Sequence, residues 1–288
     1  MIMKDVDLLV SCWTIAGTAC PHSEIEYSPF DFKDRVSAAA KAGFKGIGLK
    51  EVDLAHILER WSLKEMRRIV DDNGIAHVEL EFLTDWFPED EKKRKSDRTK
   101  QMLMIAAEAL GAGHIKIGDF DMHVIPMSPL IESFSAPCAE AASHGTKILF
   151  ELIVDAMLRT LPETLEMVEG AGAANGGIMI DLWQVVKLGI PYEDLARIPA
   201  RYLLGVELND GTLQCPWSLH EDTINHGRLC GEGEFDVKGF VNCLLNSGYS
   251  GPWGIEMLSE DLRKKPLEEA AARAFNTTIA QFPGMERR

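Results

Sequence analysis

The sequence predicts the α/β fold class, as a single (β/α)8 TIM barrel domain over residues 1–288. Eight short runs rich in Val, Ile and Leu lack strict alternation, which is typical of parallel strands covered on both faces. Each run is followed by an amphipathic segment. The order of helix end, glycine and apolar run also recurs along the chain, as in NGIAHVEL and HGTKILF. No break in composition divides the chain, and barrels of this length commonly form one domain.

An open, doubly wound sheet is the alternative architecture for such an alternation of strands and helices. It is disfavoured because no GxGxxG motif lies between the first strand and the first helix. The expected strands cover residues 7–13, 46–50, 77–82, 114–118, 147–152, 177–182, 202–208 and 253–258. The expected helices cover residues 31–42, 63–72, 98–110, 129–143, 161–174, 191–197, 236–246 and 267–281. Capping residues favour two of the helix starts, Ser62 before Leu63 and Asp97 before Arg98.

Composition restricts the classes of partner. Hydrophobic residues make up 46% of the chain, and its 45 acidic and 30 basic residues give a net charge of -15. This charge argues against nucleic acid, because phosphate binding needs a basic surface. The one local basic run, from Lys92 to Lys95, is more typical of a solvated loop or helix end.

Cysteine spacing and hydropathy indicate the compartment. The six cysteines form no CxxC pair and no zinc-finger spacing, so we expect free thiols in a reducing compartment. No secretory signal and no membrane-length apolar run are visible, so a cytoplasmic protein without a membrane partner is expected. The apolar and Trp-bearing surface loops permit a homo-oligomer.

Four acidic residues lie at or near the ends of the last four expected strands. They are Glu151 in KILFEL, Asp181 in GIMID, Glu207 in YLLGVEL and Glu256 in PWGIEM. The carboxyl ends of barrel strands share one mouth, where the active sites of such barrels lie. Because a buried carboxylate without a partner costs several kcal/mol, a bound cation is the simplest reason for four of them to converge.

The second half of the chain resembles the xylose isomerase-like barrels, also called sugar phosphate isomerase/epimerase-like proteins. The motifs that carry the resemblance are FEL, IDLWQ, VELND, RLCGEGEFD and GPWGIEMLSE, between about residues 147 and 260. This superfamily includes ketose 3-epimerases, inosose dehydratases, dehydroshikimate dehydratases and, more distantly, endonuclease IV. The resemblance is specific for the superfamily and weak for the substrate.

The resemblance implies one divalent metal held by a Glu, an Asp, a His and a Glu. The matching positions are Glu151, Asp181, Glu207 and Glu256, so a glutamate replaces the family's histidine on strand seven. Gln184 likewise replaces a substrate-contacting histidine three residues after the metal aspartate. An all-oxygen ligand set suits Mn²⁺ or Mg²⁺ better than Zn²⁺.

The activity implied is that of an isomerase or epimerase acting on a sugar or related polyhydroxy carbonyl compound. The metal would polarise a carbonyl, with Glu151 and Glu256 as the acid/base pair. A lyase, such as an inosose or keto-sugar dehydratase, shares this first step. A non-catalytic sugar-binding barrel or subunit stays open because two family histidines are replaced. An endonuclease IV-like phosphodiesterase is disfavoured by the negative charge and the acidic ligands.

Weaker candidates surround the predicted metal. The expected substrate contacts are Arg228, His226, Gln184, Trp13, Lys116 and Glu81. Arg228 has the planar fork that suits a carboxylate or phosphate, and its alternative is an ion pair with Asp222 or Glu232. A lysine inside a barrel usually has a carboxylate partner, and Glu151 or Glu81 could serve Lys116. Asn209 and Asp210 either orient the ligands or form a simple turn.

Overall fold

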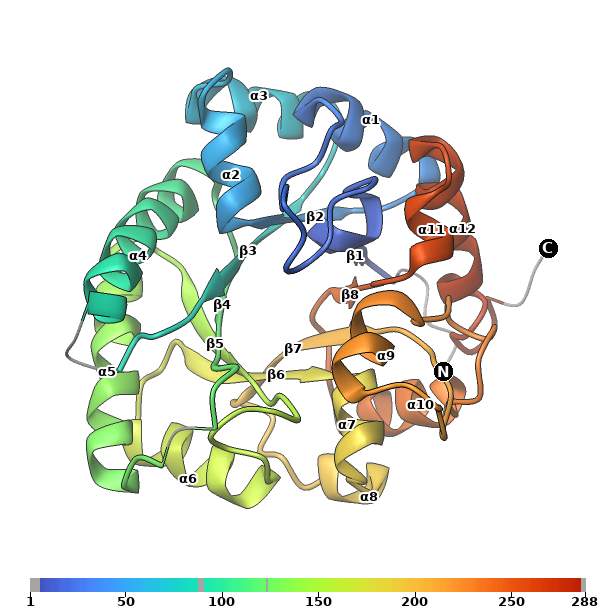
Figure 1. The fold of residues 1–288 in the computed structure, drawn as a ribbon. Coiled ribbons are helices and arrows are strands. Elements are labelled where there is room, and N and C mark those ends of the chain that lie inside the picture. The colour runs from blue at the N-terminus through green and yellow to red at the C-terminus, as the bar shows by residue number, and fades with distance from the viewer. Residues whose placement is uncertain (1–5, 88–90, 123, 286–288) are drawn as a thin grey trace.

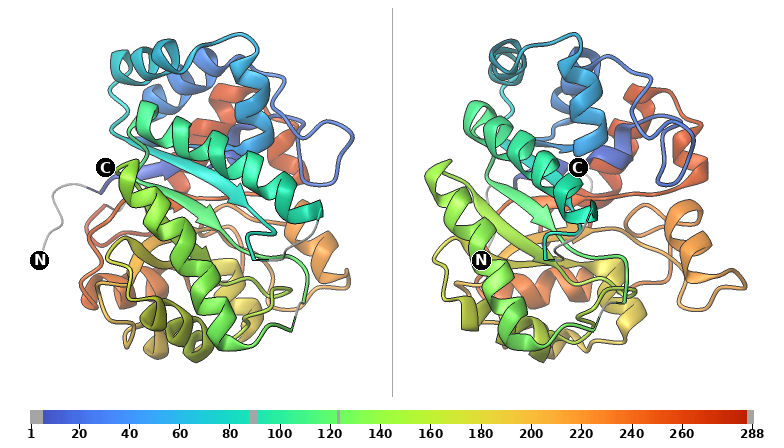
Figure 2. Two further views of the ribbon diagram at one scale, coloured as in Figure 1. Left: turned by 90° about the vertical axis from the view of Figure 1, so that its left-hand side faces the viewer. Right: turned by 60° about the vertical axis from the view of Figure 1, so that its left-hand side comes forward.

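The computed structural model describes residues 6–87, 91–122 and 124–285. Eight parallel strands close into a barrel in sequence order, with the helices around it, which confirms the predicted fold class (Figure 1). The strands are β1 (Leu8–Val10), β2 (Gly46–Lys50), β3 (His77–Leu83), β4 (His114–Ile117), β5 (Lys147–Glu151), β6 (Gly176–Asp181), β7 (Leu203–Leu208) and β8 (Trp253–Ile255). Figure 1 looks onto their carboxyl ends, and the side views of Figure 2 show the loop after β1 rising on that side.

The helices form the outer layer of the barrel. They are α1 (Phe32–Ala42), α2 (Glu51–Leu58), α3 (Leu63–Asp72), α4 (Glu91–Leu110), α5 (Met127–Ser143), α6 (Leu161–Ala171), α7 (Leu182–Leu188), α8 (Tyr192–Leu195), α9 (Leu219–Asn225), α10 (Val237–Asn246), α11 (Glu260–Arg263) and α12 (Leu267–Ile279). A short 3₁₀ helix, η1 (Cys12–Ile15), follows β1. The capping box predicted around Ser62 is present, because the Ser62 and Glu65 side chains each accept the other residue's backbone N–H.

Several boundaries differ from the sequence-based expectation, and three of them change the position given to a residue. The first expected strand ends at Val10, because the chain turns into η1, where Thr14 Oγ1 donates to Ile255 O and accepts from Met257 N. The last strand ends at Ile255, so Glu256 follows it directly. Helix α4 begins seven residues earlier than expected, at Glu91 rather than 98, so Asp97 lies inside the helix, paired with Lys93, and is not a cap.

Alternation along the strands separates an apolar outer layer from a polar barrel interior. Ile115 and Ile117 of β4 join the apolar core, whereas His114 and Lys116 bond to carboxylates from other strands. Two glycines make room for acidic side chains in this interior. A Cβ at Gly48 would lie 2.7 Å from Glu79 Oε1, and one at Gly254 would lie 2.8 Å from Glu207 Cγ.

One buried aspartate organises the long connection between β7 and α10. The Asp210 side chain is fully buried and accepts backbone N–H groups from four residues, Gly211, Gly231, Gly233 and Phe235, at 2.8–3.0 Å. Asp210 also forms an isolated antiparallel bridge with Arg228. The GEGEFD motif therefore folds around a single carboxylate, which fixes this loop beside the mouth.

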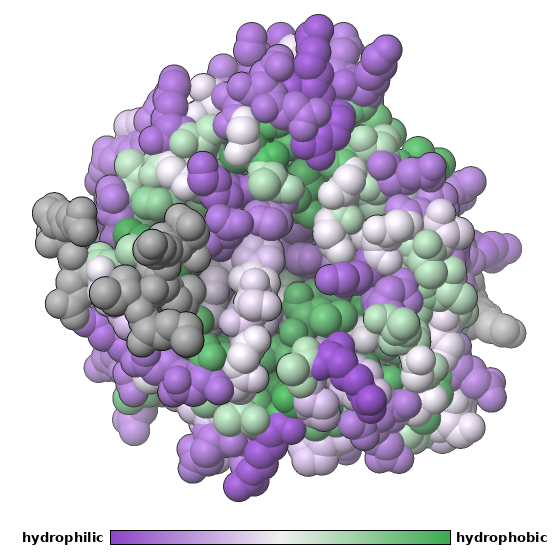
Figure 3. Space-filling view, turned by 180° about the vertical axis from the view of Figure 1, so that it is seen from behind, coloured by the Kyte–Doolittle hydropathy of each residue, from purple (hydrophilic) through white to green (hydrophobic). Residues whose placement is uncertain are grey.

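Seen from behind, the face at the amino ends of the strands is hydrophilic around its edge, with hydrophobic residues scattered nearer its centre (Figure 3). Among the described residues, no helix combines the length and the apolar character that a membrane crossing requires.

We predict that Asp210→Ala lowers the free energy of unfolding by about 3–5 kcal/mol, because several buried backbone N–H groups lose their charged acceptor. Chemical denaturation followed by circular dichroism measures this loss. The matched control is Asp236→Ala, which removes a helix cap that accepts one N–H group and should cost about 1 kcal/mol. Equal losses in the two variants would contradict the role given to Asp210.

Candidate active site

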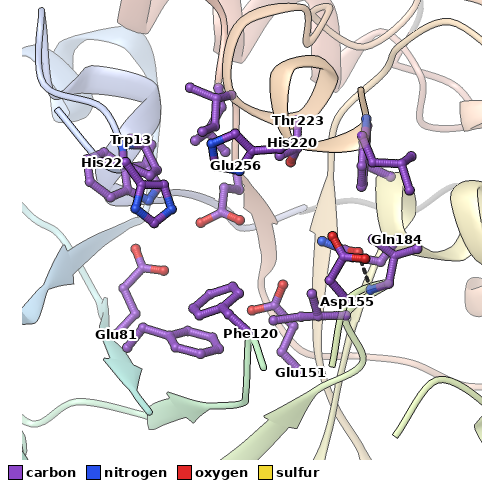
Figure 4. Close-up of a pocket in the computed structure, with 18 of the residues that line it drawn as sticks. Trp13, His22, Glu81, Phe120, Glu151, Asp155, Gln184, His220, Thr223 and Glu256 are labelled. Carbon is purple, nitrogen blue, oxygen red and sulfur yellow. Dashed lines mark hydrogen bonds between the residues drawn. The ribbon is translucent and has the colours of Figure 1, made fainter. Parts of the chain in front are cut away.

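A cavity of about 490 Å³ opens at the carboxyl ends of the strands. Three carboxylates, those of Glu81, Glu151 and Glu256, point into it from three strand ends (Figure 4). Two imidazoles face them, His22 from the loop before α1 and His220 from α9. Aromatic rings form much of its wall. The lining includes Trp13, His22, Lys50, Phe82, Phe120, Asp155, Trp183, Gln184, His220 and Thr223.

Three of the four predicted metal ligands lie together: Glu151 and Glu256 line this cavity, and Glu207 is fully buried beside them. Glu151, Glu207 and Glu256 each offer a carboxylate oxygen, and these oxygens lie within 4.8 Å of one another. Glu151 ends β5, Glu207 is the fifth residue of β7 and Glu256 follows β8, so the register of adjacent strands brings them together. We call these three residues the acid group.

The side chain of Lys116 lies within this cluster. Its Nζ is 2.7 Å from Glu81 Oε2, 2.8 Å from Glu207 Oε1, 3.3 Å from Glu256 Oε1 and 3.9 Å from Glu151 Oε2. The side chain is fully buried and does not line the cavity. The expected carboxylate partners Glu81 and Glu151 are both present, and two acids that the sequence did not suggest join them.

A second polar layer lies deeper in the barrel. Ser11 Oγ donates to Glu207 Oε1 at 2.8 Å and is 3.1 Å from Glu79 Oε1. The other oxygen of Glu79 is 2.8 Å from His114 Nε2. Both oxygens of Glu79 have partners within this layer. The layer therefore supports the acid group from the side that faces away from the cavity.

Asp181 lies outside the acid group, and its carboxylate has its own partners. Oδ1 accepts the backbone N–H of Gln184 at 2.9 Å, which caps α7, and Oδ2 accepts from Asn209 Nδ2 at 2.6 Å. Asn209 thus orients this predicted ligand. The side chain of Gln184 lines the cavity, and its Oε1 accepts the N–H of Val154 at 2.9 Å.

Burial governs the protonation of the acids. It raises the pKa of Glu151 to about 7, against the opposing influence of Lys116, and that of Asp181 to about 6. Burial and mutual repulsion also raise the pKa of Glu207 well above its usual value, and burial does so for Glu256. Burial acts to lower the pKa of Lys116. This effect is outweighed by the carboxylates of Glu207, Glu256 and Glu81, which raise that pKa well above its usual range.

The donor set fits a divalent cation. Four carboxylates surround one ammonium, so when all are ionised three negative charges stay uncompensated (four minus one). Glu207 Oε2 is buried without a hydrogen-bond partner, which a cation would provide. Hard cations such as Mg²⁺ and Mn²⁺ prefer oxygen ligands of this kind.

The predicted substrate contacts divide into two sets. Trp13 and Glu81 line the cavity beside Gln184. His226 and Arg228 do not line it: His226 stacks on Trp217 with the ring centroids 3.6 Å apart, and the 40% exposed side chain of Arg228 lies 3.6 Å from Asp261. Arg228 therefore has an acidic neighbour, although not Asp222 or Glu232.

Sequence reasoning missed the residues at the rim. His22 and His220 come from the connections after β1 and β7, with their ring centroids 5.1 Å apart. Phe120 and Asp155 come from the connections after β4 and β5. Their position after a strand's carboxyl end was the one available signal, since these segments carry no recognisable motif.

The fold, the acid group and the motifs agree with one family. The chain belongs to the xylose isomerase-like TIM barrel family, whose model matches residues 36–278. The chain is 24% identical over 255 residues to a 3-dehydroshikimate dehydratase of Pseudomonas aeruginosa, with 85% of this chain and 39% of that protein covered. The chain thus spans about two fifths of that relative's length.

Two further relatives match over nearly their full lengths. An inosose isomerase of Halalkalibacterium halodurans is 22% identical over 254 residues, covering 83% of this chain and 87% of that protein. The solved structure of the IolI protein with a bound zinc atom superposes with a TM-score of 0.82 at 18% identity, covering 96% of this chain and 98% of that one. This structural likeness shows the shared fold.

We predict that the metal-free protein loses about 4 kcal/mol of stability as pH rises from about 5 to 7.5. The folded chain keeps protons on Glu151 and Asp181 that the unfolded chain has already released, because both pKa values are raised. Unfolding therefore releases protons in this window, and stability falls with rising pH. Urea denaturation in EDTA across the pH series measures the slope.

Glu151→Gln is the control for this pH dependence, because an amide at this position does not titrate. Its stability profile should be flatter over the same pH window. A wild-type stability that rises between pH 5 and 7.5 would contradict the raised pKa values.

Proposed function

We propose that the chain is a divalent-metal-dependent isomerase or epimerase of a sugar or related polyhydroxy carbonyl compound. One observation carries the proposal: three glutamates from three strand ends offer converging oxygens, and two of these glutamates line a cavity. The family membership and the enzymes among its relatives support it. The zinc bound in the similar IolI structure supports a divalent metal.

The metal would be held by Glu151, Glu207 and Glu256, with Asp181 as a proposed fourth ligand. Each oxygen of Asp181 accepts one hydrogen bond, and a carboxylate oxygen has a second lone pair for a cation. The bound ion would supply Lewis acidity that polarises the substrate carbonyl and makes the neighbouring C–H acidic. Mn²⁺ or Mg²⁺ is the proposed occupant because every ligand is an oxygen.

Glu151 and Glu256 are the proposed pair that moves the proton. Both carboxylates face the cavity from different strand ends, and the pKa of Glu151, raised to about 7, suits proton transfer near neutral pH (Figure 4). One would remove the proton beside the carbonyl, and the other would return it. Trp13, Phe82 and Trp183 would exclude water and pack against the ring or carbon chain of the substrate.

A dehydratase is the second candidate, favoured by the similarity to 3-dehydroshikimate dehydratase. It needs the same proton abstraction, after which a β-hydroxyl leaves instead of the proton returning. The two activities differ in the product, and NMR of a reaction in D₂O separates them. An epimerase leaves deuterium at one carbon of a product of unchanged composition, whereas a dehydratase forms a new double bond.

We predict that Glu151→Gln and Glu256→Gln each lower turnover by about 10³-fold, because proton transfer loses its carboxylate. Deuterium exchange into a panel of ketoses, inososes and keto-acids provides the assay. Glu232→Gln is the control, since Glu232 pairs with Arg273 on the surface and should leave the rate unchanged. Near-normal exchange in both active-site variants would end the acid/base assignment.

We also predict that protein purified without chelator carries about one Mn²⁺ or Mg²⁺ per chain. EDTA should abolish turnover, and either ion should restore it, because no other group in the proposed mechanism polarises the carbonyl. Inductively coupled plasma mass spectrometry gives the metal content. Stoichiometric zinc, or full activity after EDTA treatment and dialysis, would contradict this assignment.

A further inference from the structure

The Lys116 ammonium has no donor left for a substrate. An ammonium has three N–H donors, and the oxygens of Glu81, Glu207 and Glu256 lie at 2.7, 2.8 and 3.3 Å from Nζ. The side chain is fully buried and takes no part in lining the cavity. Lys116 can therefore affect a reaction in the cavity only by acting on the carboxylates that it contacts.

Lys116 contacts one oxygen of each carboxylate and leaves the other. It bonds Oε1 of Glu207, which also accepts from Ser11, while Glu207 Oε2 has no partner. It bonds Oε1 of Glu256 in the same way. The carboxylates are held from one side by the lysine, and their second oxygens stay available to another cation.

Two cations that share the same carboxylates repel each other. The group is largely removed from water, so this repulsion is weakly screened and extends over several ångströms. The ammonium also supplies part of the positive charge that a divalent ion would otherwise provide. Both effects oppose the binding of the ion, whereas the ordering of Glu207 and Glu256 by hydrogen bonds favours it.

We propose that Lys116 is a built-in cation that keeps the acid group assembled without metal and weakens the binding of a divalent ion to it. It is a positioning residue for the metal site, and this inference rests on the proposed metal-dependent function. The acid group is then stable in the metal-free barrel, and the bound ion exchanges more readily than it would in a cluster of carboxylates alone.

The test compares Mn²⁺ binding by wild type and Lys116→Met, both stripped with EDTA. Methionine keeps most of the volume and removes the charge. Isothermal titration calorimetry, with free Mn²⁺ counted by electron paramagnetic resonance, should give a dissociation constant at least about tenfold lower for the variant. The rise in melting temperature on adding Mn²⁺ should also be larger in the variant, because ligand stabilisation grows as the dissociation constant falls.

Lys187→Met is the matched control. Lys187 is also a buried lysine paired with a carboxylate, 2.7 Å from Asp222, but it has no contact with the acid group. Its Mn²⁺ dissociation constant should equal that of the wild type. Should Lys116→Met fail to fold, Glu81→Gln is compared with Glu81→Gln/Lys116→Met, in which the closest ion-pair partner is already neutral. The double variant should again bind Mn²⁺ more tightly.

The outcomes separate this inference from the proposed function. Wild type that binds one Mn²⁺, with equal or weaker binding in Lys116→Met, overturns the inference and leaves the metal-dependent function intact. If Lys116→Met binds Mn²⁺ and the wild type does not, the inference is supported and the metal dependence of the wild-type enzyme is overturned. If neither protein binds Mn²⁺, both proposals are overturned.

Discussion

The ion pairs between Lys116 and the surrounding glutamates are the constraint on which the interior of this barrel depends. A barrel interior is normally filled by branched apolar side chains. Here Glu79, Glu81 and Glu207 are almost fully buried in it, and desolvation of that many charges would cost several kcal/mol each without a counter-charge. The lysine supplies that charge from β4, and Gly48 and Gly254 leave the space for the acidic side chains.

The buried acids around Lys116 differ in the direction of their pKa shifts. Burial acts to raise the pKa of Glu79, but Lys116 and His114 outweigh it and lower that pKa. Glu151, whose oxygen is 3.9 Å from Nζ, keeps a raised pKa of about 7. The barrel therefore holds one acid with a lowered pKa, Glu79, in its depth and acids with raised pKa values at the cavity, where proton transfer is proposed. Burial is similar for these acids, and Glu79 differs in the hydrogen bonds that it receives from His114 and Ser11.

The sequence was sufficient to predict the barrel, most strand bounds and the acids at the ends of strands five to eight. Those features depend on local patterns, namely apolar runs and the residues that end them. The number of partners of Lys116 could not be predicted, because it depends on the register that brings β3, β4, β7 and the end of β8 around one side chain. The rim histidines His22 and His220 were missed for a related reason: the path of a long loop is set by tertiary packing, such as the four N–H groups collected by Asp210.

Glu207 and Lys116 are best understood as a coupled pair. The resembling family has a histidine at position 207, and a neutral imidazole has one lone pair, which cannot both bind a cation and accept from a lysine. A carboxylate has two oxygens, and in this chain Oε1 accepts from Lys116 and Ser11 while Oε2 stays free. The glutamate adds a negative charge to a crowded acidic site, and the lysine offsets it. Replacing Lys116 alone would leave Glu207 without its cation, whereas replacing Glu207 alone would leave Lys116 paired with Glu81 and Glu256, so the effects of changing the two positions are expected to be non-additive.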